Sequence, residues 1–229
     1  MKKIGKMGEM AWLVGTVLCA FGVVLCTKAN LGLSMMAAPP YIIHVAASKI
    51  FPWYTQGTSE YIFQTLLMIL MWVLVGRFRI KYLLAFATAV FYGFVVDGWL
   101  ALLGGSGSFG GLPLRIAGFC VGVLCISLSV AMVFRSYLPP QIAECFVMEL
   151  STHFKADQSK VKMINDISFL VLSFSLSLLL TGGFTGVGVG TVVVSFVNAP
   201  LILLWGKLMD RYISFDPILP KWKEWMDKH

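Results

Sequence analysis

The stretch LRIAGFCVGVLCISLSVAMVF, residues 114–134, decides the class of fold. It carries a single charged residue, Arg115, and is otherwise almost entirely apolar. An α-helix rises about 1.5 Å per residue and the hydrocarbon core of a bilayer is about 30 Å thick, so a crossing needs about 20 apolar residues. We therefore predict that this stretch forms a transmembrane helix.

Further apolar runs of similar length lie on both sides of it. The chain of 229 residues is 58% hydrophobic and only 13% charged, which is more apolar than a soluble domain of this size requires. We predict an all-α membrane protein, a single membrane domain over residues 1–229, with transmembrane helices in the runs 9–27, 58–75, 82–103, 114–134, 163–181 and 187–208.

Two other segments, 31–50 and 137–154, are shorter or more polar. If both dip into the membrane and return, 15 of the 18 Lys and Arg residues lie on the cytoplasmic side; if both cross, 13 do, and the cluster at 77–81 moves outside. Cytoplasmic loops carry an excess of Lys and Arg. The charge pattern therefore favours six crossings with two re-entrant helices, and it places both termini in the cytoplasm.

A weak internal repeat divides the chain. Sliding the sequence by 107 positions superposes Gly15 on Gly122 and Lys28 on Arg135. With three crossings in each half the second copy is inverted, and inverted repeats with broken helices are typical of transporters. The predicted parts are half 1 at 7–103, a linker at 104–112, half 2 at 113–208 and a cytoplasmic amphipathic tail at 209–229.

The two short segments are where we expect a substrate pathway. A proline removes a backbone donor and disfavours helix in the residue before it, so polar backbone at these breaks must face protein or water rather than lipid. The alternative is a pair of surface helices at the two membrane interfaces. The pathway candidates are Lys28, Asn30, Ser34, Pro39, Pro40, His44, Arg135, Pro139, Pro140, Gln141, Glu144 and Asn198.

Several charged candidates have a second interpretation. Lys28 and Arg135 precede the two breaks and could attract anions at opposite mouths, or could simply extend to the interface as long basic side chains do. Glu144 is expected to face a cavity or a partner, because a carboxylate deep in a bilayer costs on the order of 3 kcal/mol. His44 suits proton coupling or a structural hydrogen bond.

Three acidic residues near helix ends are given structural roles. Glu60 and Asp166 lie near the starts of apolar runs, where capping and the helix dipole account for them. Asp97 is interpreted as an interfacial residue near the outer end of its helix.

Glycines recur every fourth residue at two places. Gly118 and Gly122 form one set, and Gly182, Gly186 and Gly190 form the other. This spacing predicts flat helix faces where another backbone approaches closely. The alternating glycines follow no strand, so a nucleotide-binding loop is not indicated, and the five cysteines show no spacing typical of a metal site.

Two short motifs resemble the YczE/YyaS/YitT group of bacterial multipass membrane proteins. They are residues 29–34, ANLGLS, and residues 186–191, GVGVGT, which lead to Asn198-Ala199-Pro200. The sequence departs from the group in having Met35-Met36 where Pro-Trp is common. The resemblance covers about residues 7–207 and implies a bacterial cytoplasmic-membrane protein for which transport is usually supposed.

We expect a small-molecule or ion permease with its substrate site between the two broken helices. The alternatives are a membrane substrate-binding subunit of a larger transport complex and a non-transporting scaffold or assembly factor. No Ser, His and carboxylate combination or HExxH motif indicates an enzyme, and no cofactor or metal is expected. The expected partners are the lipid bilayer, an unknown small solute or ion and either a second copy or an accessory subunit, but not nucleic acid.

Overall fold

The computed structural model describes residues 4–105 and 107–217. The predicted tail beyond residue 217 lies outside the described residues. In those residues the chain forms eight α-helices, one of them extended by a π-helical turn. They are α1 (Gly8–Ala29), α2 (Ala38–Ala47), α3 (Gln56–Val75), α4 (Ile80–Leu102), α5 (Leu112–Val133), α6 (Ile142–His153), α7 (Gln158–Leu176) with η1 (Ser177–Thr181), and α8 (Val189–Tyr212).

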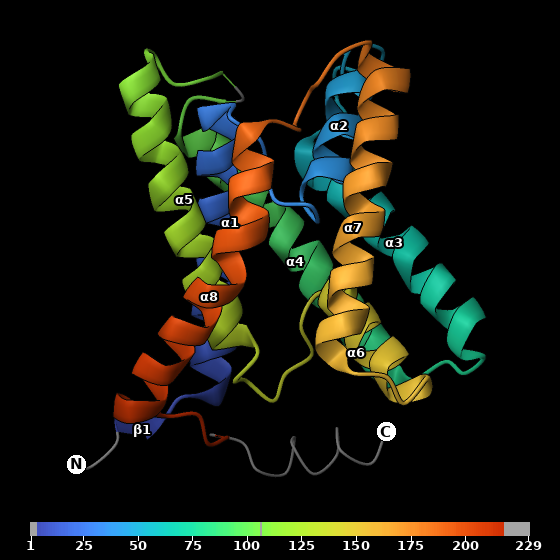
Figure 1. Ribbon diagram of the computed structural model, residues 1–229, viewed down its shortest axis with the longest axis vertical. Helices are drawn as coiled ribbons and strands as arrows, with labels where there is room; N and C mark the ends of the chain where they lie inside the picture. Colours follow the sequence, from blue (N-terminus) through green and yellow to red (C-terminus); the bar gives the residue numbers. More distant parts are fainter. Residues whose placement is uncertain (1–3, 106, 218–229) are drawn as a thin grey trace.

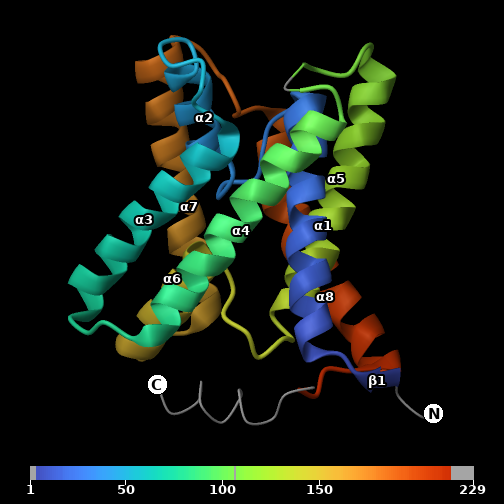
Figure 2. The same cartoon turned by 180° about the vertical axis from the view of Figure 1, so that it is seen from behind.

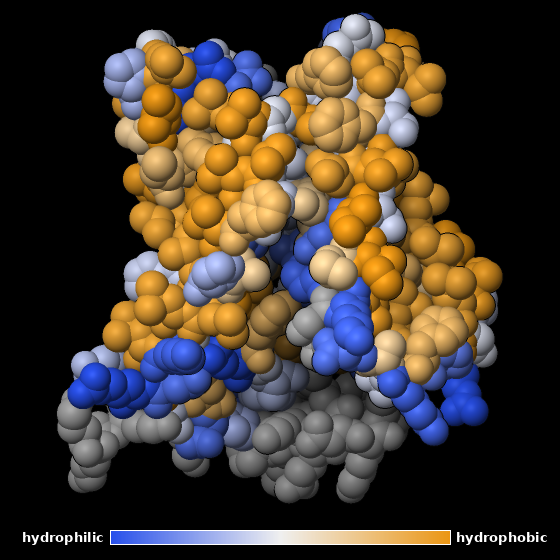
Figure 3. Space-filling view, in the orientation of Figure 1, coloured by the Kyte–Doolittle hydropathy of each residue, from blue (hydrophilic) through white to orange (hydrophobic). Residues whose placement is uncertain are grey.

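Six helices are long and apolar enough to cross a membrane by length and composition, which confirms the predicted all-α membrane fold. They are α1, α3, α4, α5, the continuous helix of α7 and η1, and α8. Their outward faces form an apolar band between two more polar ends (Figure 3). Short helices α2 and α6, at about 15 and 18 Å, are too short to span the bilayer. They lie toward opposite ends of the molecule (Figure 1).

The long helices form two groups. Helices α1, α5 and α8 pack together on one side, and α3 and α7 pack with both short helices on the other (Figure 1). Helix α4 runs diagonally across the back and contacts α1, α3 and α6 (Figure 2). Helix α7 packs on α2 and α6 whereas α8 packs on α5, so the two stand apart at the front (Figure 1). The back of the molecule is therefore closed and the front is open.

The contact between α1 and α5 depends on close backbone approach. A Cβ atom on Gly122 would lie 2.7 Å from Cys26 Sγ and 2.8 Å from the Gly22 carbonyl oxygen. A Cβ on Gly15 would likewise lie 3.2 Å from the Ser129 carbonyl oxygen. Small residues at such positions allow helices to pack tightly in a membrane.

The expectation of one glycine face over residues 182–190 is wrong. Gly182 has φ +69° and ends the π-helical turn, and no heavy atom of the described residues lies within 4 Å of the position of its missing Cβ. Gly186 has φ +74° and lies in the loop before α8, which begins only at Val189. The left-handed backbone at Gly182 ends a helix, and Gly186 adopts the same conformation in a loop, so the three glycines do not share one helix face.

The prolines start the short helices and do not break them. Pro39 and Pro40 are buried in the first turn of α2, where a missing backbone donor costs nothing. Pro139 and Pro140 precede α6 in an unwound segment, and the Pro139 carbonyl accepts a hydrogen bond from Trp12 Nε1 at 3.3 Å. Each short segment is thus an irregular stretch followed by a short helix.

A small parallel sheet was not expected. Strand β1 (Ile4–Lys6) pairs with β2 (Ile213–Ser214), and the Met7 amide donates to the Ser214 carbonyl oxygen at 3.1 Å. These strands are too short to leave a periodic signal in sequence. The pairing holds the two described ends of the chain together at one end of the molecule (Figure 1).

Candidate functional site

A cavity of about 120 Å³ lies between the two groups of helices. All the long helices contribute to its wall, and so do residues 34–37 before α2 and Gln141, Ala143 and Glu144 at the start of α6. The surface view shows a hollow between α7 and α8 with hydrophilic residues inside it, framed by apolar surface (Figure 3). The cavity therefore places a few polar side chains at the centre of an apolar bundle.

Charged side chains in the cavity come from three helices. Glu60 lies on α3, Glu144 on α6, and Lys162 and Asp166 lie one turn apart on α7. Lys162 Nζ lies 3.3 Å from Asp166 Oδ1. Burial raises the pKa of the Glu144 carboxyl, and the positive charge of Lys162 partly offsets that effect. Three carboxyl groups thus share the cavity with one amine.

Amide side chains add polar groups that lack partners. Gln64 Nε2 donates to Gln141 Oε1 at 2.7 Å, which joins α3 to the segment before α6. Among the described residues, no hydrogen-bond partner lies near Gln64 Oε1, Glu60 Oε1 or Asn198 Oδ1. All three side chains line the cavity, and all three unpartnered atoms are oxygens. Buried acceptors without partners are costly unless a ligand or water satisfies them.

Four predicted pathway residues line this cavity: Ser34, Gln141, Glu144 and Asn198. Pro140 lines a smaller cavity of about 20 Å³ next to it, together with Gln141 and Glu144. The remaining candidates line neither cavity. They are Lys28, Asn30, Pro39, Pro40, His44, Arg135 and Pro139.

Lys28 and Asn30 belong to the end of α1. Lys28 Nζ donates to the Gly105 carbonyl oxygen at 2.8 Å and so holds the linker between the halves. Asn30 ends α1 in a left-handed conformation, φ 49°, and Arg115 Nε donates to the neighbouring Ala29 carbonyl oxygen at 2.7 Å. These residues cap a helix, because its last carbonyl groups need donors.

Arg135 and His44 also lie away from the cavity. Arg135 forms a two-pronged ion pair with Asp210 at 2.6 and 2.7 Å, which joins the end of α5 to α8. His44 is half-buried near the end of α2, and burial lowers its pKa by disfavouring the charged ring. The geometry therefore gives neither residue a place on the cavity wall.

The two motifs that carry the family resemblance touch one another. The Gly190 amide donates to the Leu31 carbonyl oxygen at 2.8 Å, and the Leu33 amide donates to the Gly186 carbonyl oxygen at 2.9 Å. A Cβ on Gly32 would lie 2.7 Å from Thr191 N. The glycines let two irregular segments pair closely, one before α2 and one before α8.

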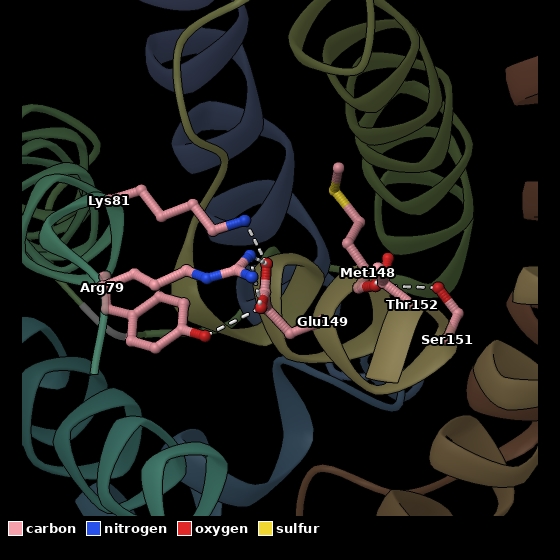
Figure 4. A network of polar contacts seen from close by, with 7 residues as sticks. Arg79, Lys81, Met148, Glu149, Ser151 and Thr152 are labelled. Atoms are coloured by element: carbon pink, nitrogen blue, oxygen red, sulfur yellow. Dashed lines mark hydrogen bonds and ion pairs between the residues drawn. The ribbon is translucent and has the colours of Figure 1, made fainter. Parts of the chain in front are cut away.

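A second polar cluster holds α6 in place at the end of the molecule that carries β1 and β2 (Figure 1). Glu149 Oε2 accepts from Tyr82 Oη at 2.8 Å and from Arg79 Nη1 at 3.3 Å, and Lys81 forms an ion pair with the same carboxylate (Figure 4). Burial alone would raise the pKa of Glu149, but these donors together lower it. The cluster joins α6 to the loop before α4 and to the start of that helix.

Four cavity residues were missed as site residues in the sequence: Glu60, Gln64, Lys162 and Asp166. Glu60 does not cap α3. That role belongs to Thr55, whose Oγ1 accepts from the Thr58 amide at 3.0 Å, and to Asp97, whose Oδ1 accepts from the Gly57 amide at 2.9 Å. The only available signal was the presence of ionisable residues in or next to a membrane span.

The bundle and its central cavity define a multipass membrane protein with a central site. The family model that matches is described as a family of unknown function, DUF6198, and it matches residues 7–207. The chain therefore belongs to this family. Neither the curated proteins nor the solved structures gave a match. The resemblance to the YczE/YyaS/YitT group stays a prediction.

Proposed function

We propose that the protein is a small-molecule permease of the bacterial cytoplasmic membrane, with its substrate site in the central cavity. The single observation that carries the proposal is this cavity, which all the long helices and the segments before both short helices line together. Sites of this kind near the middle of a membrane bundle, bounded by discontinuous helices, are typical of secondary transporters.

The pattern of helix packing supports two inverted halves. If α1 to α4 correspond to α5 to α8, the contact of α1 with α4 corresponds to that of α5 with α8, and the contact of α2 with α3 to that of α6 with α7. The contact of α2 with α7 likewise corresponds to that of α6 with α3. The short helices lie toward opposite ends of the molecule, as inversion requires (Figure 1).

One pair of contacts departs from this symmetry. Helix α3 packs on α4 at the back, whereas the corresponding helices α7 and α8 stand apart at the front (Figures 1 and 2). Alternating access in inverted-repeat transporters is largely a rocking of one half against the other around a fixed site. The departure supports a two-state mechanism in which α7 closes on α8 while α3 separates from α4.

The charge distribution supports cytoplasmic termini. Both described ends of the chain, the loop between α3 and α4, and the connection from α5 to α6 lie at one end of the molecule (Figure 1). This end carries Arg77, Arg79, Lys81, Arg135 and Arg211, whereas the opposite end carries Lys28, Lys49 and Arg115. The excess of basic residues supports the assignment of the first end to the cytoplasm.

Flux through purified protein in liposomes tests the proposal. Radiolabelled cations, anions and neutral solutes small enough for the cavity are offered to proteoliposomes and to protein-free liposomes under an imposed pH gradient. We expect at least one solute to equilibrate faster in the proteoliposomes. Equal rates for every solute, under gradients of both directions, would overturn the proposal.

A further inference from the structure

The polar atoms of the central cavity identify the chemistry of its ligand. Glu60 and Gln64 line the cavity, are 4% and 2% exposed, and each carries a buried oxygen without a partner among the described residues. Asn198 presents a third such oxygen from α8. An oxygen acceptor is satisfied by a hydrogen-bond donor, so the matching ligand carries N–H or O–H groups.

The charge of the cavity indicates that this ligand is a cation. Glu60, Glu144 and Asp166 against Lys162 give a formal charge of −2 when all four are ionised. The segments that begin α2 and α6 line the cavity, and each helix N-terminus contributes roughly +0.5, which reduces the total to about −1. One positive charge therefore neutralises the cavity.

A metal ion does not fit the donors. Among the described residues no group of three or more His, Cys, Asp or Glu side chains could hold a metal. The rest of the wall is largely apolar and includes Phe63, Ile126 and Val130. A cavity of about 120 Å³ accommodates roughly eight to twelve water-sized groups. Apolar walls beside a few convergent polar atoms are typical of sites for organic ligands.

We propose that the cavity binds a small monovalent organic cation, a protonated amine whose N–H groups donate to Glu60, Gln64 and Asn198. A carboxylate buried in a bilayer is costly without a positive partner. Without ligand a carboxyl group of the cavity therefore carries a proton, and with ligand the ammonium group takes the place of that proton. On binding, the O–H bond of the carboxyl group breaks, the proton passes to water and the ammonium group takes its place. No bond to the ligand forms.

Proton and amine then compete for one site, and this competition would couple their movements in opposite directions. The titratable groups that face Glu60 are Glu144 from α6, Lys162 and Asp166 from α7, Cys19 from α1, and Tyr92 and Asp97 from α4. Lys162 is paired with Asp166, so Glu60 and Glu144 are the groups that exchange the proton. This coupling, but not the binding itself, rests on the proposed function.

Binding to the purified protein in detergent tests the proposal without any transport. The probes are benzylammonium, benzyl alcohol and benzoate, which share one size and differ in charge, with sodium chloride as the inorganic control. We expect only benzylammonium to raise the melting temperature, by about 3–6 °C at about ten times its Kd. Equal stabilisation by benzyl alcohol, benzoate or sodium would overturn the proposal.

Proton release is the second readout. In weakly buffered solution the wild type should release about one proton per benzylammonium bound, and its Kd should fall by up to about tenfold per pH unit as pH rises. Glu60→Gln should release no proton and bind at least about tenfold more weakly. Glu9→Gln is the matched control, because Glu9 accepts from Tyr137 Oη at 2.6 Å and lies outside the cavity.

If Glu60→Gln fails to fold, the pH dependence of the Kd of benzylammonium for the wild-type protein still tests the proposal. A Kd that does not change with pH, or unchanged binding by Glu60→Gln, would overturn the cation site. Transport of an anion or neutral solute without amine binding would overturn this inference and leave the permease standing. Amine binding without flux of any solute would support the cation site and overturn the proposed permease function.

Discussion

Replacing Gly122 with Ala tests the packing of α1 on α5, the closest helix contact in the group formed by α1, α5 and α8. The added methyl group would lie 2.7 Å from Cys26 Sγ and 2.8 Å from the Gly22 carbonyl oxygen. Because that oxygen belongs to the backbone of α1, the two helices must move apart to admit the methyl group. We expect the substitution to destabilise the protein although alanine favours helix.

The magnitude follows from two opposing effects. Overpacking of this kind costs about 1–3 kcal/mol, whereas replacing glycine with alanine inside a helix gains about 0.5–1 kcal/mol. The net loss is about 1–2 kcal/mol, which lowers the melting temperature by about 2–8 °C in a chain of this length. Gly98→Ala in α4 is the matched control, because no atom of residues 4–105 and 107–217 lies within 4 Å of its missing Cβ.

A thermal melt with a thiol-reactive dye in detergent measures both variants. Cys26 is 1% exposed at the contact between α1 and α5, so in a background with Cys19, Cys120, Cys125 and Cys145 replaced by Ser its reaction reports the separation of these helices. We expect Gly122→Ala to melt below the wild type and Gly98→Ala to melt at or up to about 4 °C above it. If Gly122→Ala melts as high as Gly98→Ala, the described packing of α1 on α5 is wrong.

Three further predictions concern stability and orientation. Glu149→Gln should lower the unfolding free energy by about 1–2 kcal/mol, since it weakens hydrogen bonds to a buried charge whose basic partners are partly solvated. The pKa of Glu149 is lowered from its usual 4.5, so its contribution is complete above that value and is lost as pH falls through the folded pKa. Melts of the two proteins should therefore converge as pH falls below 4.5, and a gap that persists at low pH would contradict this. Asp97→Asn removes the negative charge that faces the Gly57 amide at the start of α3 and should cost about 1 kcal/mol, again measured by melting; no loss would refute the capping role. In intact cells Trp53→Cys should react with a membrane-impermeant thiol reagent and Arg77→Cys should not, relative to the unmodified chain; the reverse pattern would contradict cytoplasmic termini.

The transmembrane helices could be predicted because each leaves an uninterrupted apolar run. The predicted runs 58–75 and 82–103 fall within a few residues of α3 and α4. Spans can be predicted from hydropathy without knowing the tertiary contacts, because lipid requires every residue of a span to be apolar or paired. Strands β1 and β2 leave no comparable signal, because three and two residues show no periodicity.

The cavity could be predicted only in part. Gln141 and Glu144 stood out because they are polar residues in a segment next to a proline pair. Glu60 and Asp166 did not stand out, because near the start of an apolar run a cavity residue looks the same as a cap. Only tertiary packing, which turns Glu60 inward and leaves capping to Asp97, separates the two roles.

The resemblance motifs show the same limit. Gly32 and Gly190 were expected near a pathway or on a helix face, and the packing instead pairs their segments through backbone hydrogen bonds. Such pairing joins segments more than 150 residues apart and leaves no local pattern. Spacing within one helix could not reveal it.

The central claim is that solute passes through the cavity between α7 and α8. The most direct test compares two tryptophan substitutions on neighbouring residues of α8, in the proteoliposome flux assay and with the solute that the wild type transports. Ser195 lines the cavity, whereas Phe196 is 77% exposed on the outer face. We predict that Ser195→Trp fills the cavity and abolishes flux while Phe196→Trp keeps the wild-type rate, with both variants melting as folded proteins. Wild-type flux through folded Ser195→Trp would contradict the account.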